Sequence, residues 1–300
     1  MERSWLFARL TVAAGGCPDE RVTELVRTVL PDLVAAVRRH DPRAGWFFDR
    51  PGGPGLSLGF HAGRSGLREV DRRLRAHPGP ASVTSGLPDP YAVRDTARGG
   101  PLAQAGSELA LAVLADGAVP ADAELPVAVL HLGHLVDLVP AADRAAFLFL
   151  HWQDSSGSLT GAQRRDLVAQ ADAEAEKLVL AATHLAMTPG RAAAAHRYLN
   201  AVRDLTAQDC RSSGAPRTWL LAEHARLTQR RLGIGPAVDA LAAMALRLAI
   251  LRDGALVLSP PDPPVPPDGH PATPGATTRA KVPRQRAAAG ARTTPREVPT

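Results

Sequence analysis

The segment His151-Trp152-Gln153-Asp154 places an imidazole and a carboxylate directly after the apolar run 147–150. Imidazoles and carboxylates commonly transfer protons in enzymes, and polar groups that follow a buried element often form a site. We therefore predict His151 and Asp154 as catalytic residues. The alternative is an ordinary helix end, with Asp154 as a capping residue and Trp152 half-buried.

Two further polar side chains lie in segments with helical spacing. His184 falls within the apolar run 178–187, and Tyr198 is one of two tyrosines in the chain. Both are predicted as catalytic groups, because an imidazole or a phenol can donate a proton to an amide oxygen. The alternatives are a hydrogen-bonded core histidine and a packed tyrosine whose hydroxyl reaches the surface.

Other motifs give weaker evidence for a functional site. His131 and His134 lie one helical turn apart with Asp137 after them, a spacing that can hold a metal, but the apolar residues around them favour a core helix. The glycines at 233 and 235 lack the preceding strand and third glycine of a dinucleotide site. The sequence contains no Walker loop, nucleophile elbow or zincin motif.

The N-terminal third is predicted to form a sheet with helices. Aromatic and branched residues predict strands at 5–12, 45–50 and 55–61, and the Pro-Gly-rich residues 51–54 join the last two as a hairpin. Apolar residues at helical spacing predict helices at 18–37, which Pro31 kinks or splits, and at 65–76.

After Pro101 the chain is alanine-rich, and apolar residues recur at three-and-four spacing. The order of elements predicts an α+β fold, with an N-terminal antiparallel or mixed sheet followed by a large helical part. The predicted helices of this part span 102–114, 127–139, 141–150, 159–187, 191–207, 219–232 and 236–251.

Charge and composition divide the chain into a folded domain, 1–258, and a tail, 259–300. The tail is proline-rich, lacks aromatic residues and holds +3 of the net charge of +5, so we predict that it is disordered. The remaining charge predicts no specific nucleic-acid partner. Two cysteines predict no disulfide framework, and no apolar run reaches the about 20 residues of a membrane span, so we expect a cytoplasmic protein without a membrane partner.

Three stretches carry a family resemblance. The first is W-x-F-x-R-L at 5–10 with the following Trp46-Phe47-Phe48 strand and hairpin; the second runs from Tyr91 to Gly99-Gly100 and on through 101–109; the third is RLTQRRLGI at 226–234. In this order, over 5–251, they resemble the C-terminal domain of lantibiotic dehydratases, also called thiopeptide-type bacteriocin biosynthesis proteins. The matching family motifs include Y-x-P-E-x-x-R-Y-G-G and H-M-x-x-N-R-L-G.

Eliminating members of that family remove glutamate from glutamylated serine or threonine. They carry H-x-R-x-R on the third strand, an arginine before Y-G-G and a histidine opening the last motif. Here the strand reads Gly55-Leu56-Ser57-Leu58-Gly59. At the position of the family's arginine before Y-G-G this chain has Ala97, and at the position of the tyrosine it has Arg98. Shifting the alignment by one residue would place Arg98 at the position of that arginine. Arg226 replaces the histidine and Arg230 the asparagine. Loss of the carboxylate clamp and the imidazole together predicts that elimination is lost.

A stand-alone chain of this kind is most similar to the thiopeptide pyridine synthases of the family. The resemblance implies a modified precursor peptide, leader and core, with azoles and two dehydroalanines. The enzyme would hold the two alkenes face to face for a formal four-plus-two cycloaddition, followed by loss of water and of the leader peptide. We expect no metal or redox cofactor, because positioning supplies much of the rate of such a reaction.

Within the same resemblance, guanidinium forks would bind peptide carbonyls or leader carboxylates. A solvated helix face accounts for any one arginine equally well. A strand edge at 5–12 or in the hairpin also offers strand addition for the leader. The predicted substrate-binding residues are Arg50, Tyr91, Arg98, Trp152, Arg226, Arg230 and Arg231.

Two alternative functions stay open on these residues. One is a glutamate-elimination subunit of a split lantibiotic-type dehydratase. The other is a non-catalytic subunit of the same pathway that binds the leader peptide. In each case other enzymes of the pathway are expected partners.

Overall fold

The computed structural model describes residues 3–11, 18–50, 55–77, 82–86, 100–185, 188–213 and 216–253. The chain divides into two units, Met1–Pro264 and Val265–Thr300, and all elements described below belong to the first. The predicted tail, 259–300, lies outside the described residues.

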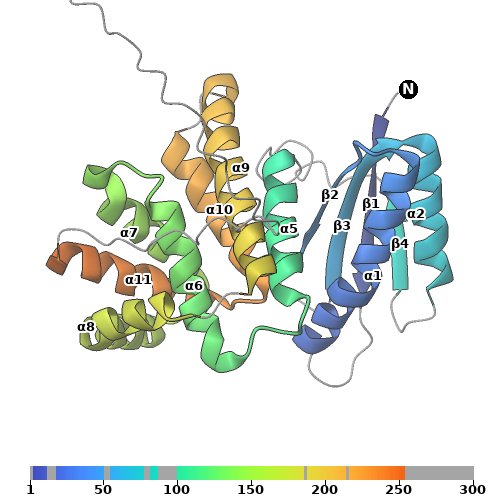
Figure 1. Cartoon of the computed structure of the whole chain (residues 1–300). Coiled ribbons are helices and arrows are strands. Elements are labelled where there is room, and N and C mark those ends of the chain that lie inside the picture. The colour runs from blue at the N-terminus through green and yellow to red at the C-terminus, as the bar shows by residue number, and fades with distance from the viewer. Residues whose placement is uncertain are drawn as a thin grey trace, which may run out of the picture. The chain divides into compact units, whose positions relative to one another are not determined.

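Four antiparallel strands form one sheet in the order β2-β3-β1-β4 (Figure 1). The strands are β1 (Arg3–Thr11), β2 (Gly45–Asp49), β3 (Gly55–Gly63) and β4 (Ser82–Gly86), so the three predicted strands are confirmed. Strand β4 was missed because its sequence, SVTSG, lacks the apolar alternation of a strand. It pairs with β1, which is therefore internal from Phe7 to Thr11, and the predicted strand edge at 5–12 is wrong over that range.

One face of the sheet is covered by α1 (Pro18–His40) and α2 (Arg64–Ala76) (Figure 1). Helix α1 runs unbroken through Pro31, so the predicted split is wrong. Its buried face packs on the strands, and carboxylates in its first turn and basic residues in its last turn match the helix dipole. The core-facing residues of α1 are Val22, Val26, Val29, Leu30, Leu33 and Val37.

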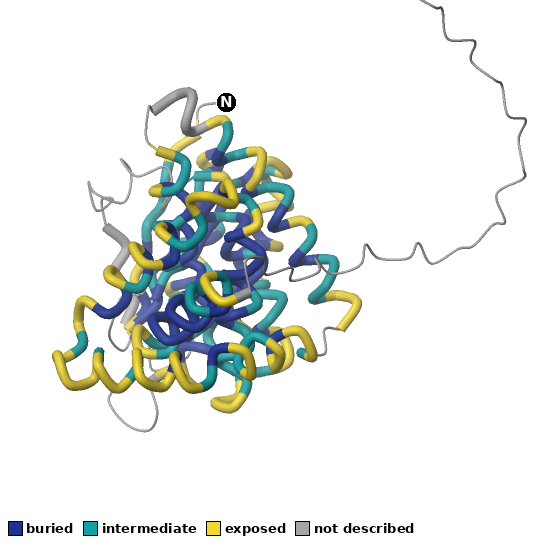
Figure 2. The backbone as a smooth tube through the Cα atoms, turned by 90° about the vertical axis from the view of Figure 1, so that its left-hand side faces the viewer, coloured by how far each residue is buried: buried dark blue, intermediate teal, exposed yellow. Residues whose placement is uncertain are grey.

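The predicted helical part is confirmed, with shifted ends. Helix α7 continues through His151 and Asp154 to Ser155, so the predicted helix end at 150 is wrong. Figure 2 shows the buried residues gathered in the interior of the fold. The main core cluster contains residues of the sheet and of these helices, and a smaller cluster lies between α8 and α11. The helices are α5 (Pro101–Leu114), α6 (Ala121–Val136), α7 (Arg144–Ser155), α8 (Gly161–Thr183), α9 (Pro189–Ser213), α10 (Arg217–Leu232) and α11 (Pro236–Asp253).

The outer edge of β2 is closed by the helical part. The backbone N–H of Trp46 donates to Gln104 Oε1 at 3.4 Å, and that of Phe48 donates to Ser107 Oγ at 3.1 Å. The carbonyl of Phe48 accepts from Arg231 Nε at 2.6 Å. Since these groups are occupied, the prediction that the hairpin edge takes a leader peptide by strand addition is wrong at β2.

Candidate functional site

Helix α10 separates two groups of polar side chains. His224, Thr228 and Arg231 lie on one side and are at most 1% exposed. Glu223, Arg226 and Arg230 lie on the other side and reach solvent in part. The spacing of each group, three or four residues, keeps its members on one face of the helix.

The partly exposed face of α10 carries arginines that are paired with carboxylates. Arg226 contacts Glu223 at 2.7 Å and Asp154 at 3.2 Å, and Arg230 forms an ion pair with Asp49 at the end of β2. Although burial acts to lower the pKa of Arg226, the Glu223 and Asp154 carboxylates raise it above its ordinary value. The two arginines therefore connect α10 to α7 and to the sheet.

A groove of about 450 Å³ lies between α7 and the N-terminal half of α10. It brings together His151 and Asp154 from α7 with Trp219 and Glu223 from α10. Trp219 is 53% exposed, an unusual position for so large an aromatic side chain. Two of the four predicted catalytic residues thus share one surface depression. The groove is lined by Phe147, Leu150, His151, Asp154, Pro216, Thr218, Trp219, Ala222 and Glu223.

His151 is fixed by a buried carboxylate. Its Nε2 lies 2.9 Å from Asp239 Oδ1, and the other oxygen of Asp239 accepts from Ser155 Oγ at 2.6 Å. Burial acts to lower the pKa of His151, but the Asp239 charge outweighs it and the pKa is raised. Asp239 shows the complementary effect: burial acts to raise its pKa, and His151 lowers it overall. The pair favours a charged imidazolium against a carboxylate.

Arg231 lies on the buried face of α10, away from solvent. Arg231 is 1% exposed and burial lowers its pKa, so the alternative of a solvated helix face is wrong for this residue. Arg50 is 9% exposed and donates from Nη2 to Thr23 Oγ1 at 2.9 Å. It packs on Gly233, where φ is +86° and a β-carbon would lie 2.7 Å from Arg50 Nη1. The geometry of both arginines is that of structural cations.

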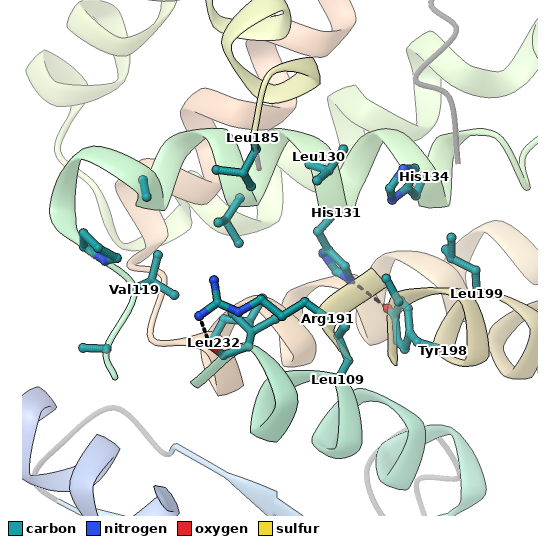
Figure 3. Close-up of a pocket in the computed structure, with 16 residues that line it drawn as sticks. Leu109, Val119, Leu130, His131, His134, Leu185, Arg191, Tyr198, Leu199 and Leu232 are labelled. Atoms are coloured by element: carbon teal, nitrogen blue, oxygen red, sulfur yellow. Dashed lines mark hydrogen bonds between the residues drawn. The ribbon is translucent and has the colours of Figure 1, made fainter. Parts of the chain in front are cut away.

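A second, mostly apolar cavity of about 120 Å³ lies among α5, α6, α9 and the end of α10 (Figure 3). His131 projects into it from α6, and its Nε2 lies 2.7 Å from Tyr198 Oη on α9. Tyr198 is 3% exposed, so the alternative of a surface-reaching hydroxyl is wrong. Arg191 forms part of the wall, donates to the carbonyl of Val113 and forms an ion pair with Asp116.

In and behind this cavity, His131, Tyr198 and His224 are buried and uncharged, and the buried Arg231 lies beside His224. Burial lowers the pKa of His131 to about 3 and raises that of Tyr198. Burial, together with the charge of Arg231, holds the pKa of His224 well below its usual range. His224 stacks on Tyr198 with ring centres 5.5 Å apart. Neutral imidazole and phenol groups at a buried site can donate and accept hydrogen bonds without a counter-ion.

Other predicted site residues line neither the groove nor the cavity, or lie outside the described residues. His184 is exposed at the C-cap of α8, so the alternative of a core histidine is wrong, and it lines neither the groove nor the cavity. Trp152 is partly buried, stacks on Phe149 and packs against the core. Tyr91 and Arg98 lie outside the described residues.

Several polar residues of these sites were missed as functional candidates. The core-helix interpretation of His131 and His134 is confirmed, since both are 7% exposed, yet both also line the cavity. His224 and Asp239 contact Tyr198 and His151 across the fold. Their partners are distant in sequence, so spacing along the chain carries no signal for them.

The sheet face opposite α1 and α2 carries aromatic side chains at the place of the absent arginines. Phe7, Gly59 and Phe47 are neighbours across β1, β3 and β2. A β-carbon on Gly59 would lie 2.3 Å from Phe47 Cε1, so the Phe47 ring lies directly over this position. Phe47 also packs edge-on against Trp5 and Phe7. Together with Ser57, this surface offers no arginine from β3 for a carboxylate.

Among the residues that the structure describes, no group of three or more histidine, cysteine, aspartate and glutamate side chains could hold a metal ion. Within the same ranges, none of the helices has the length and apolar character to cross a membrane.

No protein-family model matches the chain, and no curated protein matches it in sequence. Solved structures do match. The pyridine synthase TbtD from thiomuracin biosynthesis is 18% identical, with a TM-score of 0.57 over 85% of this chain and 100% of that one. TsrL is 16% identical, with a TM-score of 0.57 over 84% of this chain and 96% of that one.

The tRNA-dependent lantibiotic dehydratase MibB from Microbispora sp. 107891 is 22% identical, with a TM-score of 0.51 over 84% of this chain but 28% of its own. The family resemblance of the sequence is thus confirmed at the level of the fold. This chain shares its fold with the pyridine synthase over the whole length of that chain and with about a quarter of the dehydratase.

Proposed function

We propose that this chain is a thiopeptide pyridine synthase, acting on a modified precursor peptide that bears two dehydroalanines. The observation that supports this most is the sheet face at β3. The chain shares its fold with a pyridine synthase and with a segment of a dehydratase. Phe47 fills the space above Gly59, a position at which the sequence resemblance places an arginine of the eliminating members. The carboxylate clamp of glutamate elimination has no room there.

In the proposed reaction, one dehydroalanine supplies a two-carbon alkene. The other supplies a four-atom unit with its neighbouring amide in the iminol form. Two bonds form to close a six-membered ring, and loss of water and then of the leader peptide as a carboxamide makes the ring aromatic. Holding the two units together can supply about 7 to 11 kcal/mol of the barrier at best.

The proposed proton donor is His151. Its Nε2 is engaged by Asp239, which leaves Nδ1 to donate, and the Asp239 charge, which raises the pKa of His151, favours the protonated ring. A proton delivered to the departing oxygen or amide nitrogen makes each a better leaving group. Such a donor contributes about 10²- to 10⁴-fold in rate. Asp154, at the rim of the same groove, would orient or reprotonate the donor.

The proposed path of the peptide follows the exposed face of α10. The 16-residue helix spans about 24 Å from the groove to the sheet. An acidic leader would compete with Asp154 and Asp49 for Arg226 and Arg230, which would keep the predicted binding role of these arginines. Trp219 offers an exposed aromatic contact beside the groove.

The experiment is to incubate the full chain with its bis-dehydroalanine precursor, without added cofactor, and to follow the products by mass spectrometry. We expect a pyridine-containing core and a free leader carboxamide. His151→Gln should lower the rate by about 10²-fold or more, while His184→Gln, on the surface, should leave it unchanged. Glutamate release from a glutamylated peptide would instead identify an elimination subunit, and leader binding with an unchanged peptide would identify a non-catalytic one.

A further inference from the structure

The cavity shown in Figure 3 is separate from the groove and has the size of one small ring. Its volume is about 120 Å³, and no residue lines both hollows. Dry apolar cavities of about 150 Å³ bind single aromatic rings such as benzene. Most of the wall is aliphatic, from Leu109 and Val113 on α5, Val127 and Leu130 on α6, and Leu199 on α9.

One wall of the cavity is polar and incompletely satisfied. His131 is 7% exposed, and its Nδ1 has no hydrogen-bond partner although its Nε2 is bonded to Tyr198. A buried polar atom without a partner is costly and commonly marks a place where a ligand or water binds. Arg191 contributes a second such atom, its Nε.

The charge states of His131 and Arg191 favour a neutral ligand in this cavity. His131 is neutral, because burial lowers its pKa to about 3, and the charge of Arg191 is already balanced by Asp116 at 3.1 Å. A charged ligand would lose its hydration here without gaining an unpaired counter-charge. Whichever nitrogen of His131 carries the proton, the His131–Tyr198 pair keeps one N–H or O–H to donate, so the occupant should carry an acceptor.

Access to the cavity does not require a helix to unfold. Val119 and Pro120 belong to the connection between α5 and α6, and Leu185 follows the end of α8. All three line the cavity, so its rim is built partly from chain outside the helices. Connecting segments lie at the surface and adjust more readily than packed helices.

We propose that this cavity binds one small, neutral, nitrogen-containing aromatic ring, of the size of thiazole or oxazole. The ring stacks among the aliphatic side chains and accepts a hydrogen bond from the His131–Tyr198 pair or from Arg191. It can arrive as a free molecule or as an azole within a peptide. The peptide source rests on the function proposed above, because that substrate carries azoles; the free source does not.

The test uses the full chain alone, without turnover. Free thiazole is titrated against the protein while the ring protons of Tyr198 and His131 are followed by NMR, and saturable shifts with a Kd of about 1 mM or tighter are expected for five ring atoms. Leu199→Phe should abolish the shifts by filling the cavity. Leu180→Phe, at a side chain 57% exposed on α8, should leave them unchanged.

Tyr198→Phe keeps the shape of the wall and removes the hydroxyl. It should weaken thiazole about 10-fold, the effect of one hydrogen bond, and leave benzene unaffected. Equal binding of benzene and thiazole in both proteins would overturn the assignment of the acceptor. Absence of saturable shifts, or shifts that survive Leu199→Phe while the variant keeps its circular dichroism spectrum, would overturn the site itself.

A second arm separates the sources of the ring. A short peptide with one thiazole is compared with the same peptide carrying alanine, and free thiazole is added as a competitor. If the thiazole peptide and free thiazole compete for the cavity, the occupant is an azole within a peptide. If free thiazole binds and the peptide does not compete with it, the occupant is a free molecule. Because no product is measured, a failed pyridine-forming reaction would leave this result standing, and the reverse also holds.

Discussion

The two faces of α10 use similar residue types in opposite ways. On the exposed face, Arg226 and Arg230 pair with carboxylates of α7 and β2 and stay in reach of solvent. On the buried face, Arg231 has a carbonyl as its partner and His224 is neutral. An arginine in water can exchange one carboxylate for another at little cost, whereas a buried one is fixed by the groups around it. The exposed face therefore suits recognition, and the buried face suits precise placement of the helices.

The largest difference between the faces is expected from two arginine substitutions. Arg231→Met should lower the free energy of unfolding by about 3 kcal/mol, because the buried Phe48 carbonyl would keep only the long contact of 3.5 Å from Ser107 Oγ. Arg230→Met, one residue earlier on the exposed face, should cost less than about 1 kcal/mol. Urea unfolding followed by circular dichroism measures both. Equal losses would contradict the distinction between the faces.

The next largest effect is expected from acid acting on two buried histidines, His131 on α6 and His224 on α10. Burial lowers the pKa of His131 from 6.5 to about 3, so below pH 6.5 the unfolded chain binds a proton that the folded chain does not. This contribution to stability is complete above pH 6.5 and falls with pH, by about 2 kcal/mol between pH 6.5 and 5. His224, whose pKa is also lowered, acts in the same direction.

The control for this pH effect is a pair of histidine variants. His131→Gln should reduce the loss of stability between pH 6.5 and 5 and leave the part that comes from His224. His184→Gln on the surface should leave the profile as it is. His151 acts in another range: its pKa is raised, so its contribution is present below its ordinary pKa and is lost as the pH rises through the raised value. A profile without an acid limb in the wild type would contradict a neutral, buried His131.

Close packing between α5 and α10 predicts a smaller effect. A β-carbon on Gly106 would lie 2.6 Å from Thr228 Oγ1 and 3.0 Å from Arg231 Nη1. Gly106→Ala should therefore lower the free energy of unfolding by about 1 to 2 kcal/mol, in spite of the better helix propensity of alanine. Gly190→Ala on α9, where the β-carbon meets open space, should be neutral or slightly stabilising. Thermal unfolding of both variants measures whether the close packing of α5 against α10 at Gly106 contributes to stability.

The smallest effect is expected for the exposed pair between α10 and α7. A double-mutant cycle with Arg226→Gln and Asp154→Asn should give a coupling of about 0.5 kcal/mol, which salt weakens. The Asp154 side chain is 68% exposed, so water competes for its charge. A coupling above about 2 kcal/mol, insensitive to salt, would show that this face is as fixed as the buried one.

Most helices and strands could be predicted from the sequence, because they have regular patterns of apolar residues. Strands β1, β2 and β3 are rich in aromatic and branched residues, and the later helices repeat apolar residues every three or four positions. Strand β4 has no such pattern and is held by pairing with β1, which no local signal reveals. Helix α7 runs past His151 because Asp239 and Arg226 bind its polar last turn from other helices.

The candidate site was predictable in part for the same reason. His151 and Asp154 follow an apolar run, and that local contrast identified them, whereas Asp239 lies 88 residues away in sequence from its partner. Helix α10 is polar on both faces, so its sequence does not separate the buried Arg231 from the partly exposed Arg230. That distinction arises from which face meets the sheet, α5 and α9, and is a property of tertiary packing.

The Phe47 ring over Gly59 also bears on how such a chain can evolve. Any side chain added at position 59 meets that ring at once, and the ring is itself held by Trp5 and Phe7. An arginine at this position would thus need at least a second change at Phe47, with the first change alone costing stability. The aromatic surface therefore opposes a single-step change: one substitution at position 59 cannot place an arginine on β3 without displacing the Phe47 ring.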